Sequence, residues 1–119
     1  MDEPAVVDHA AALDRADGDR EFFLALAKLF LQESPKEAAA ARAALDREDQ
    51  AGLVAAVHKL KGSVVEICAP RLYECAKRLE ELGRQGALTE ASCAYGEVEI
   101  RLAEVHAALR NLIAGGFPS

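Results

Sequence analysis

The sequence predicts an all-α protein, an antiparallel four-helix bundle with one or two additional helices at its N-terminus. Its 119 residues include 25 Ala and 15 Leu with few aromatic residues, a composition that strongly favours helices. Apolar residues recur at steps of three and four, and no segment alternates with period two for long enough to form a strand. A chain of this length with 51% hydrophobic residues can bury one core, so we expect a single domain over residues 1–119.

Three of the predicted helices lie in the N-terminal part of the chain. The first covers about 6–16 and stops before Asp17-Gly18-Asp19, which provides a helix stop and then an N-cap. The second carries one apolar face, formed by Phe22, Phe23, Leu26, Leu29 and Phe30. Ser34-Pro35-Lys36-Glu37 combines a capping box with proline at the first helical position, which predicts a third helix over about 35–47.

The C-terminal part predicts the three remaining helices. They run from Asp49 or Gln50 to about Cys68, from Pro70 to 83–86, and from a Thr89 cap to 115–116. Each has apolar residues at near-heptad spacing: Leu53, Val57, Leu60, Val64 and Ile67; then Leu72, Cys75, Ala76, Leu79 and Leu82; then Ala91, Tyr95, Val98, Leu102, Val105, Leu109 and Leu112. This spacing is typical of near-parallel packing in bundles, and short loops make neighbouring helices antiparallel.

Charge and cysteine content exclude several classes of function. Fourteen basic and twenty acidic side chains give a net charge of −6, without a basic stripe, so neither nucleic acid nor an anionic membrane is an expected partner. No apolar run approaches the ~20 residues of a membrane span, and the N-terminus is acidic where a signal peptide is basic.

Cys68, Cys75 and Cys93 lack metal-ligand spacing and predict reduced, buried thiols, with no metal. We expect a cytoplasmic monomer, and the initiating Met and terminal glycines favour a stand-alone protein.

One histidine lies on the outward face of a predicted bundle helix. At about 100° per residue, His58 points roughly 140° away from the Leu53–Ile67 seam. Gly62 lies one turn further along, although glycine inside a helix costs about 1 kcal/mol relative to alanine. Lys61 places a cation beside the imidazole. The rest of this face carries small or apolar residues and predicts a docking surface formed by Ala51, Ala55, Val65 and Ala69.

The surroundings of His58 favour one kind of chemistry. General acid–base catalysis needs a pocket and an orienting carboxylate, and neither is evident on this face. Metal binding needs further ligands three or four residues away, and His58 has no His, Cys or carboxylate there. Ser63 lies about 140° round the helix, out of reach as a nucleophile. An exposed imidazole with a nearby cation suits attack on a phosphoryl group brought by another protein. The alternative is an ordinary surface histidine, with Gly62 serving helix packing.

The stretch from His58 to Ala69 resembles the signature of histidine-containing phosphotransfer (HPt) domains. That signature reads His-x-Leu-Lys-Gly-Ser/Ala-Ser/Ala-x-x-Leu/Ile-Gly-Ala, and the matching residues are His58, Leu60, Lys61, Gly62, Ser63, Ile67 and Ala69. The resemblance extends over about 10–115. Two positions depart from it: Val64 replaces a small residue on the core side, and Cys68 replaces glycine.

The resemblance implies that His58 is the phosphoacceptor of a multistep two-component phosphorelay. It would take a phosphoryl group from the aspartyl phosphate of one receiver domain and pass it to the aspartate of another, the partners being receivers of a hybrid sensor kinase or of response regulators. Lys61 would help to hold the phosphoryl group, and Gly62 would keep the site open. No phosphate-binding loop or nucleotide motif is present, so neither autokinase activity nor a cofactor is expected. Mg²⁺ is expected only in the receiver.

Two other functions remain open. The chain could be a helical adaptor without chemistry, a degenerate relative of the family, or an enzyme that uses His58 as a general base. His9 and His106 are expected to have no function, His106 because it follows a seam residue and so projects outward. The face that carries Phe22, Phe23 and Phe30 is expected to be core, with part of it at the edge of the partner surface.

Overall fold

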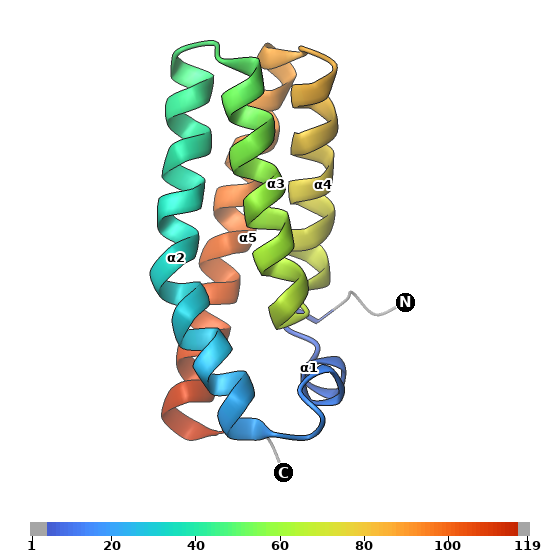
Figure 1. Ribbon diagram of the computed structural model, residues 1–119, viewed down its shortest axis with the longest axis vertical. Coiled ribbons are helices and arrows are strands. Elements are labelled where there is room, and N and C mark those ends of the chain that lie inside the picture. Colours follow the sequence, from blue (N-terminus) through green and yellow to red (C-terminus); the bar gives the residue numbers. More distant parts are fainter. Residues whose placement is uncertain (1–4, 117–119) are drawn as a thin grey trace.

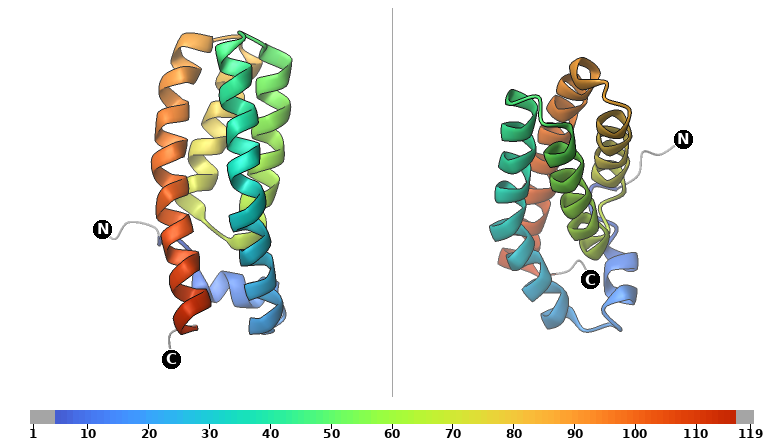
Figure 2. Two further views of the ribbon diagram at one scale, coloured as in Figure 1. Left: turned by 90° about the vertical axis from the view of Figure 1, so that its left-hand side faces the viewer. Right: turned by 45° about the horizontal axis from the view of Figure 1, so that its top comes forward.

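Four long helices form an antiparallel bundle, and a short helix lies across one end of it (Figures 1 and 2). The computed structural model describes residues 5–116. Its helices are α1 (His9–Arg15), α2 (Arg20–Asp46), α3 (Gln50–Ile67), α4 (Pro70–Arg84) and α5 (Leu88–Gly115). No strand occurs between residues 5 and 116, so the predicted all-α bundle is confirmed. None of these helices combines the length and the apolar character that a membrane span needs.

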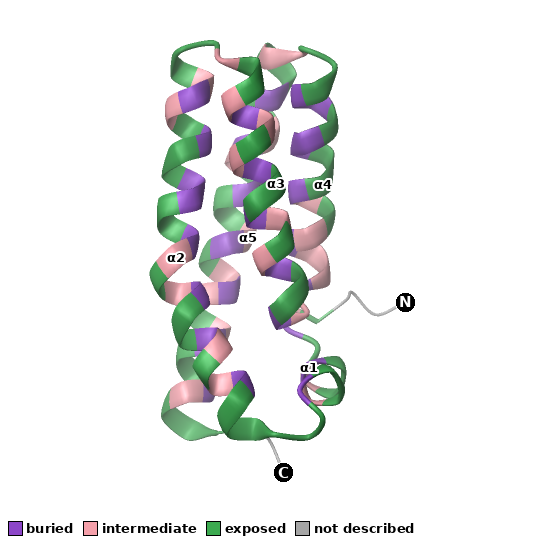
Figure 3. Cartoon of the chain, viewed as in Figure 1, coloured by how far each residue is buried: buried purple, intermediate pink, exposed green. Residues whose placement is uncertain are grey.

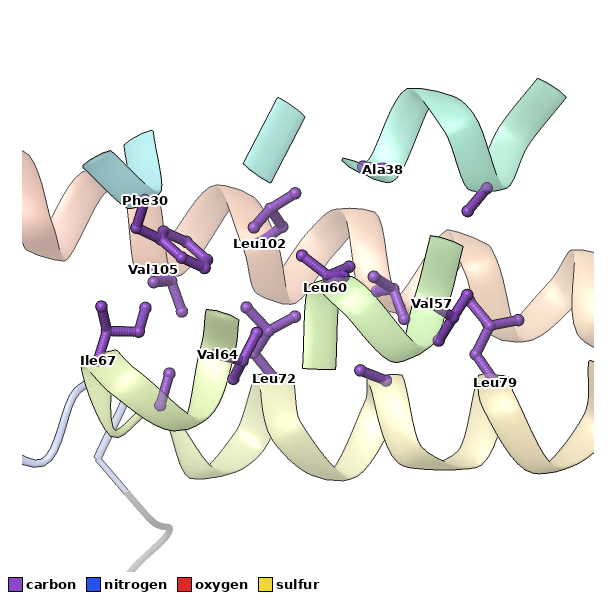
Figure 4. Packing of buried hydrophobic residues seen from close by; sticks show 14 of the residues in the cluster. Phe30, Ala38, Val57, Leu60, Val64, Ile67, Leu72, Leu79, Leu102 and Val105 are labelled. Carbon is purple, nitrogen blue, oxygen red and sulfur yellow. The ribbon is translucent and has the colours of Figure 1, made fainter. Parts of the chain in front are cut away.

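Each long helix turns one apolar stripe towards a common core. The α3 seam is the centre of this core, and its side chains are at most 1% exposed: Leu53, Val57, Leu60, Val64 and Ile67. Figure 4 shows four of them, Val57, Leu60, Val64 and Ile67, among Phe30 of α2, Leu72 and Leu79 of α4, and Leu102 and Val105 of α5. Buried positions face the bundle interior along the long helices (Figure 3). The near-heptad spacing therefore identified the inward faces correctly.

The helix α2 passes through Ser34 and Pro35 without a break, so the prediction of two separate helices there is wrong. Ser34 does not cap a helix: it is fully buried, and its Oγ lies 2.8 Å from His106 Nε2 on α5. The buried face of α2 continues on both sides of Pro35, and packing of this face against the bundle favours one continuous helix over two. Proline inside a helix removes one backbone hydrogen bond and bends the helix. Figure 1 shows the corresponding change of direction between the two parts of α2.

The ends of the bundle helices agree with the prediction except at the start of α5, whereas α1 begins at His9, after an Asp8 cap, and not near residue 6. Asp19 caps α2 through Phe22 N–H at 3.0 Å, and Asp49 caps α3 through Gly52 N–H at 2.9 Å. Thr89 is not a cap, because α5 begins at Leu88 and its N-cap, Ala87, has no side-chain hydrogen bond. The turn before α5 is instead made by Gly86, whose φ of 73° suits glycine.

Several side chains differ from their predicted environment. Phe22 is expected in the core with Phe23 and Phe30, but it is 53% exposed while the other two are buried. His106 does not project outward: it is half-buried between α5 and α2, and its ring meets Phe30 edge-on with centroids 5.9 Å apart. Burial lowers its pKa. Cys93 is exposed, whereas Cys68 and Cys75 are half-buried, so the prediction of three buried thiols is wrong for Cys93.

The chain leaves α3 through a residue in the left-handed conformation. Cys68 has φ 55° and ψ 59°, a region that glycine adopts without strain and other residues adopt at a cost. The glycine of the family signature is therefore favoured here by backbone geometry. The turn carries Ala69 inward, where it is only 2% exposed. Ala69 consequently does not belong to the predicted docking surface.

Candidate functional site

His58 lies on the outward face of α3, as its angle from the seam predicts. Its side chain is 65% exposed, while Val57 beside it is completely buried. One turn further along α3, a Cβ added to Gly62 would meet no other atom within 4 Å. The alternative in which Gly62 serves helix packing is therefore excluded. The backbone beside the imidazole is open.

A carboxylate on the neighbouring helix reaches the imidazole. Glu80 of α4 has a side chain only 5% exposed, and its Oε2 lies 3.2 Å from His58 Nδ1. Lys61 Nζ donates to Glu80 Oε1 at 2.9 Å, and Arg84 Nε donates to Glu80 Oε2 at 3.1 Å. The expectation that no orienting carboxylate lies near His58 is therefore wrong, because α4 supplies one across the helix interface.

The sequence contains only a weak signal for Glu80. It follows the buried Leu79, which places it at the edge of the α4 apolar stripe, and Arg84 lies one turn further on. Many surface helices carry such a pair. Its position opposite His58 depends on the rotation of α4 against α3, which spacing along either helix does not specify.

The charges around Glu80 keep it ionised. Burial would raise the pKa of this carboxyl, but the hydrogen bonds from Lys61, Arg84 and His58 outweigh burial and lower the pKa to about 2. An ionised carboxylate only accepts hydrogen bonds, so His58 Nδ1 must donate. In the neutral imidazole, the free lone pair then lies on Nε2. Glu80 thereby selects the ring nitrogen that is left unprotonated.

The two cationic side chains near His58, Lys61 and Arg84, differ in how far they are exposed to solvent. The Lys61 side chain is 23% exposed and its ammonium is bound to Glu80, so it does not stand free beside the ring. The Arg84 side chain is 58% exposed. It lines, together with His58, Ala51 and Ala55, a shallow hollow of about 730 Å³ between α3 and the end of α4. Arg84, which the sequence analysis missed, thus brings a cation to the side of the imidazole.

The predicted docking residues do not form one patch. Ala51 and Ala55 are exposed and border the hollow that contains His58. Val65 is 39% exposed, but it borders a different hollow of about 350 Å³ at the far end of α3, together with Ala69 and Tyr73. Between residues 5 and 116, no group of three His, Cys, Asp or Glu side chains is placed to hold a metal ion.

The lowered pKa of Glu80 predicts a specific loss of stability in acid. Glu80 stabilises the fold fully above its unfolded pKa of about 4.5, and this contribution disappears as the pH falls through about 2. The change in pKa corresponds to about 3 kcal/mol. Urea unfolding of wild type and Glu80→Gln should differ by about this amount at pH 7 and converge near pH 2. Exposed Glu81 provides the control, Glu81→Gln, and a wild-type advantage over Glu80→Gln that persists at pH 2 would contradict the prediction.

Comparisons with known proteins agree with this architecture. The family model for the Hpt domain matches residues 25–114. The chain is similar to the crystal structure of histidine-containing phosphotransfer protein B from Pseudomonas aeruginosa, with a TM-score of 0.86 and 22% identity over 94% of this chain and 97% of that chain. It is also similar to the HPT domain of a sensor hybrid histidine kinase from Shewanella, with a TM-score of 0.81 and 19% identity over 92% of this chain and 94% of that chain. At such identities these two likenesses concern the fold. A comparison with curated proteins gave no match.

Proposed function

Because the chain belongs to the Hpt domain family, and is therefore a histidine-phosphotransfer protein of phosphorelays, we propose that His58 is its phosphoacceptor. The observation that carries this proposal is the exposed imidazole whose Nδ1 is held by a buried, ionised carboxylate 3.2 Å away. This contact leaves Nε2 as the nucleophile. Members of the family are relay intermediates rather than autokinases, so the phosphoryl group must come from a partner protein.

The proposed step needs no proton transfer. Nε2 of neutral His58 attacks the phosphorus of an aspartyl phosphate on a receiver domain, and the bond between phosphorus and the aspartate oxygen breaks. The aspartate leaves as a carboxylate. The ring keeps its proton on Nδ1 and becomes cationic, and the adjacent Glu80 carboxylate stabilises that charge. Transfer to a second receiver aspartate reverses these events, so one site serves both directions.

Lys61 and Arg84 are proposed to balance the charge of the phosphoryl group. Each still has N–H donors after its contact with Glu80, because an ammonium has three and a guanidinium has five. Arg84 borders the hollow that contains His58 and can turn its free N–H groups towards a phosphoryl group on Nε2. Lys61 can share its ammonium between Glu80 and a phosphoryl oxygen.

The partners of this site are receiver domains, with which Hpt domains interact. We propose that the receiver covers His58 and rests on Ala51 and Ala55, whose small side chains allow a close approach. No cofactor is assigned to the chain. Any Mg²⁺ that the reaction needs is proposed to be held by the receiver.

Incubation with a phosphorylated receiver domain tests the proposal. The chain should take up label that is stable in base and lost in acid, as expected of phosphohistidine. A helical adaptor would bind the receiver without taking up label. An enzyme that uses His58 as a general base would release the phosphoryl group to water and keep none. Either of these outcomes would overturn the proposal.

Gly62 provides a prediction in which stability and activity move apart. Alanine is the better helix former and the position is open, so Gly62→Ala should raise the free energy of unfolding by up to about 1 kcal/mol. A glutamine at the same position would extend beside the imidazole and obstruct the receiver. Gly62→Gln should therefore slow transfer by about tenfold or more, through misplacement of the reacting groups, without lowering the melting temperature.

Gly96 of α5 is a matched control for Gly62. It is also inside a helix, and a Cβ added to it would meet no atom within 4 Å. Gly96→Gln should leave the rate of transfer unchanged. A Gly62→Gln protein with a lower melting temperature and a normal rate per folded molecule would contradict the open-site explanation.

A further inference from the structure

A second groove lies on the other side of α3 from Glu80, between α3 and α2. It has a volume of about 400 Å³, and its apolar part includes Leu29, Phe30 and Ile67. Leu29 is 54% exposed and Leu26 of the same lining is half-buried, so part of this apolar lining is open to solvent. Three carboxylates also line the groove, those of Glu33, Glu37 and Glu66. The groove therefore combines an apolar wall with a concentration of negative charge.

Glu37 is the unusual member of this lining. It is only 7% exposed, and its Oε2 accepts a hydrogen bond from Ser63 Oγ at 3.2 Å. Its Oε1 has no hydrogen-bond partner, and among residues 5–116 it is the one buried side-chain oxygen or nitrogen in this situation. Buried polar atoms are nearly always paired, so an unpaired one needs an explanation. Burial also raises the pKa of Glu37, because the charged form is poorly solvated.

The charged side chains that line the groove do not provide a hydrogen-bond partner for Glu37 Oε1. Lys59 is the one cation in the lining, and it makes no hydrogen bond to Oε1. At the rim, Glu33 is paired with Lys36 at 3.0 Å, but both side chains are solvated and such pairs are easily exchanged. Glu66 is exposed. The groove thus favours a ligand that is cationic at its tip and apolar along its stem.

The position of the groove identifies the source of such a ligand. Gly62 and Ser63 line it, and Gly62 lies one turn from His58 on the same helix. A receiver that covers His58 must extend over this part of α3. The groove is therefore within reach of the partner proposed above.

We propose that this groove receives an arginine side chain of the docking receiver domain, with its guanidinium on Glu37. This inference rests on the proposed function. A guanidinium is more weakly hydrated than an ammonium, so it loses less hydration free energy on reaching the buried carboxylate of Glu37. Its several N–H groups can reach Oε1 and a second carboxylate together. The methylene stem of the arginine matches the apolar wall formed by Leu29 and Phe30. The groove would then select receivers that carry arginine at this position.

The site is first tested without any receiver, using N-acetyl-arginine amide as the probe. Titrated into the ¹⁵N-labelled chain, it should shift the amide signals of Gly62 and Ser63 in a saturable manner, and more strongly than N-acetyl-lysine amide. Glu37→Gln should weaken probe binding by about fivefold, the effect of one modest ion pair. Glu90→Gln, which changes the net charge equally at an exposed position of α5, should have no effect. Equal binding by wild type and Glu37→Gln would overturn the proposal.

The receiver that labels the chain provides the second test. Glu37→Gln should bind this receiver about fivefold more weakly, while its melting temperature stays the same or rises because a buried unpaired charge has been removed. At saturating receiver, His58 should still take up label. Unchanged receiver affinity would overturn the arginine proposal and leave the phosphotransfer function intact. Absence of label in wild type would contradict the phosphotransfer function instead, and the probe titration would still decide on the groove.

Discussion

A His58→Gln variant is expected to take up no phosphoryl group from a phosphorylated receiver, while its free energy of unfolding stays within about 0.5 kcal/mol of wild type. The loss is complete because glutamine has no nucleophilic ring nitrogen. Stability is retained because the side chain is 65% exposed and the glutamine amide can still donate to Glu80. The two measurements are label uptake and urea unfolding on the same preparation.

His9 offers the matched control, since it lies in α1, which meets α3 at its Cys68 end and does not border the hollow that contains His58. His9→Gln should take up label at the wild-type rate. His106→Gln should do so too, but with lower stability, because Ser34 Oγ is buried and loses its partner. Label on His58→Gln would show that another residue is the acceptor. Unfolding of His58→Gln would show that the imidazole has a structural role.

Glu80→Ala is expected to have the largest effect on stability and transfer together. It removes the anion that Lys61, Arg84 and His58 share, and it leaves a partly buried ammonium without its partner. Breaking a buried ion pair by removing one member is strongly destabilising, but Arg84 can turn into solvent, so we expect a loss of about 2–3 kcal/mol. Transfer should slow by about ten- to hundredfold per folded molecule, because the imidazole loses its orientation and its tautomer.

The conservative variant Glu80→Gln separates the orientation of the His58 imidazole from the negative charge of the carboxylate. The amide oxygen in Glu80→Gln can still accept from His58 Nδ1–H, so this variant should recover part of the rate while the stabilisation by ionised Glu80 remains absent. Glu81→Ala, at the next and exposed position, should change neither quantity. A destabilised Glu80→Ala with a wild-type rate per folded molecule would mean that Glu80 only holds α3 and α4 together.

Properties that depend on one helix at a time could be predicted from the sequence. The angle between successive residues is the same in every α-helix, so the α3 seam and the outward direction of His58 both follow from spacing alone. Gly62 could be recognised as unusual because glycine destabilises the interior of a helix. The structure shows that the position is open, with no atom within 4 Å of an added Cβ. The departure at Cys68 was also visible, although its reason, a left-handed backbone, was not.

Properties that depend on two helices could not be predicted in this way. Ser34-Pro35 reads locally as a helix start, but packing along both halves of α2 and the contact from Ser34 to His106 keep the helix continuous. The turn at the end of α3 buried Ala69, which helical periodicity had placed outside. A tertiary contact overrode a local preference in α2, and the left-handed turn at Cys68 ended the helical periodicity before Ala69.

The sequence by itself therefore determined the helical class, the core, the exposed histidine and the glycine beside it, since these require only the geometry of a single helix. The tertiary structure alone decided that Glu80 contacts His58 Nδ1 and binds the ammonium of Lys61. It also decided that Arg84 borders the hollow that contains His58, and that Glu37 is buried without a partner for Oε1. The physical reason is that the rotation and register between packed helices are set by many side chains at once, whereas spacing along one helix carries no information about which residue of its neighbour it will meet.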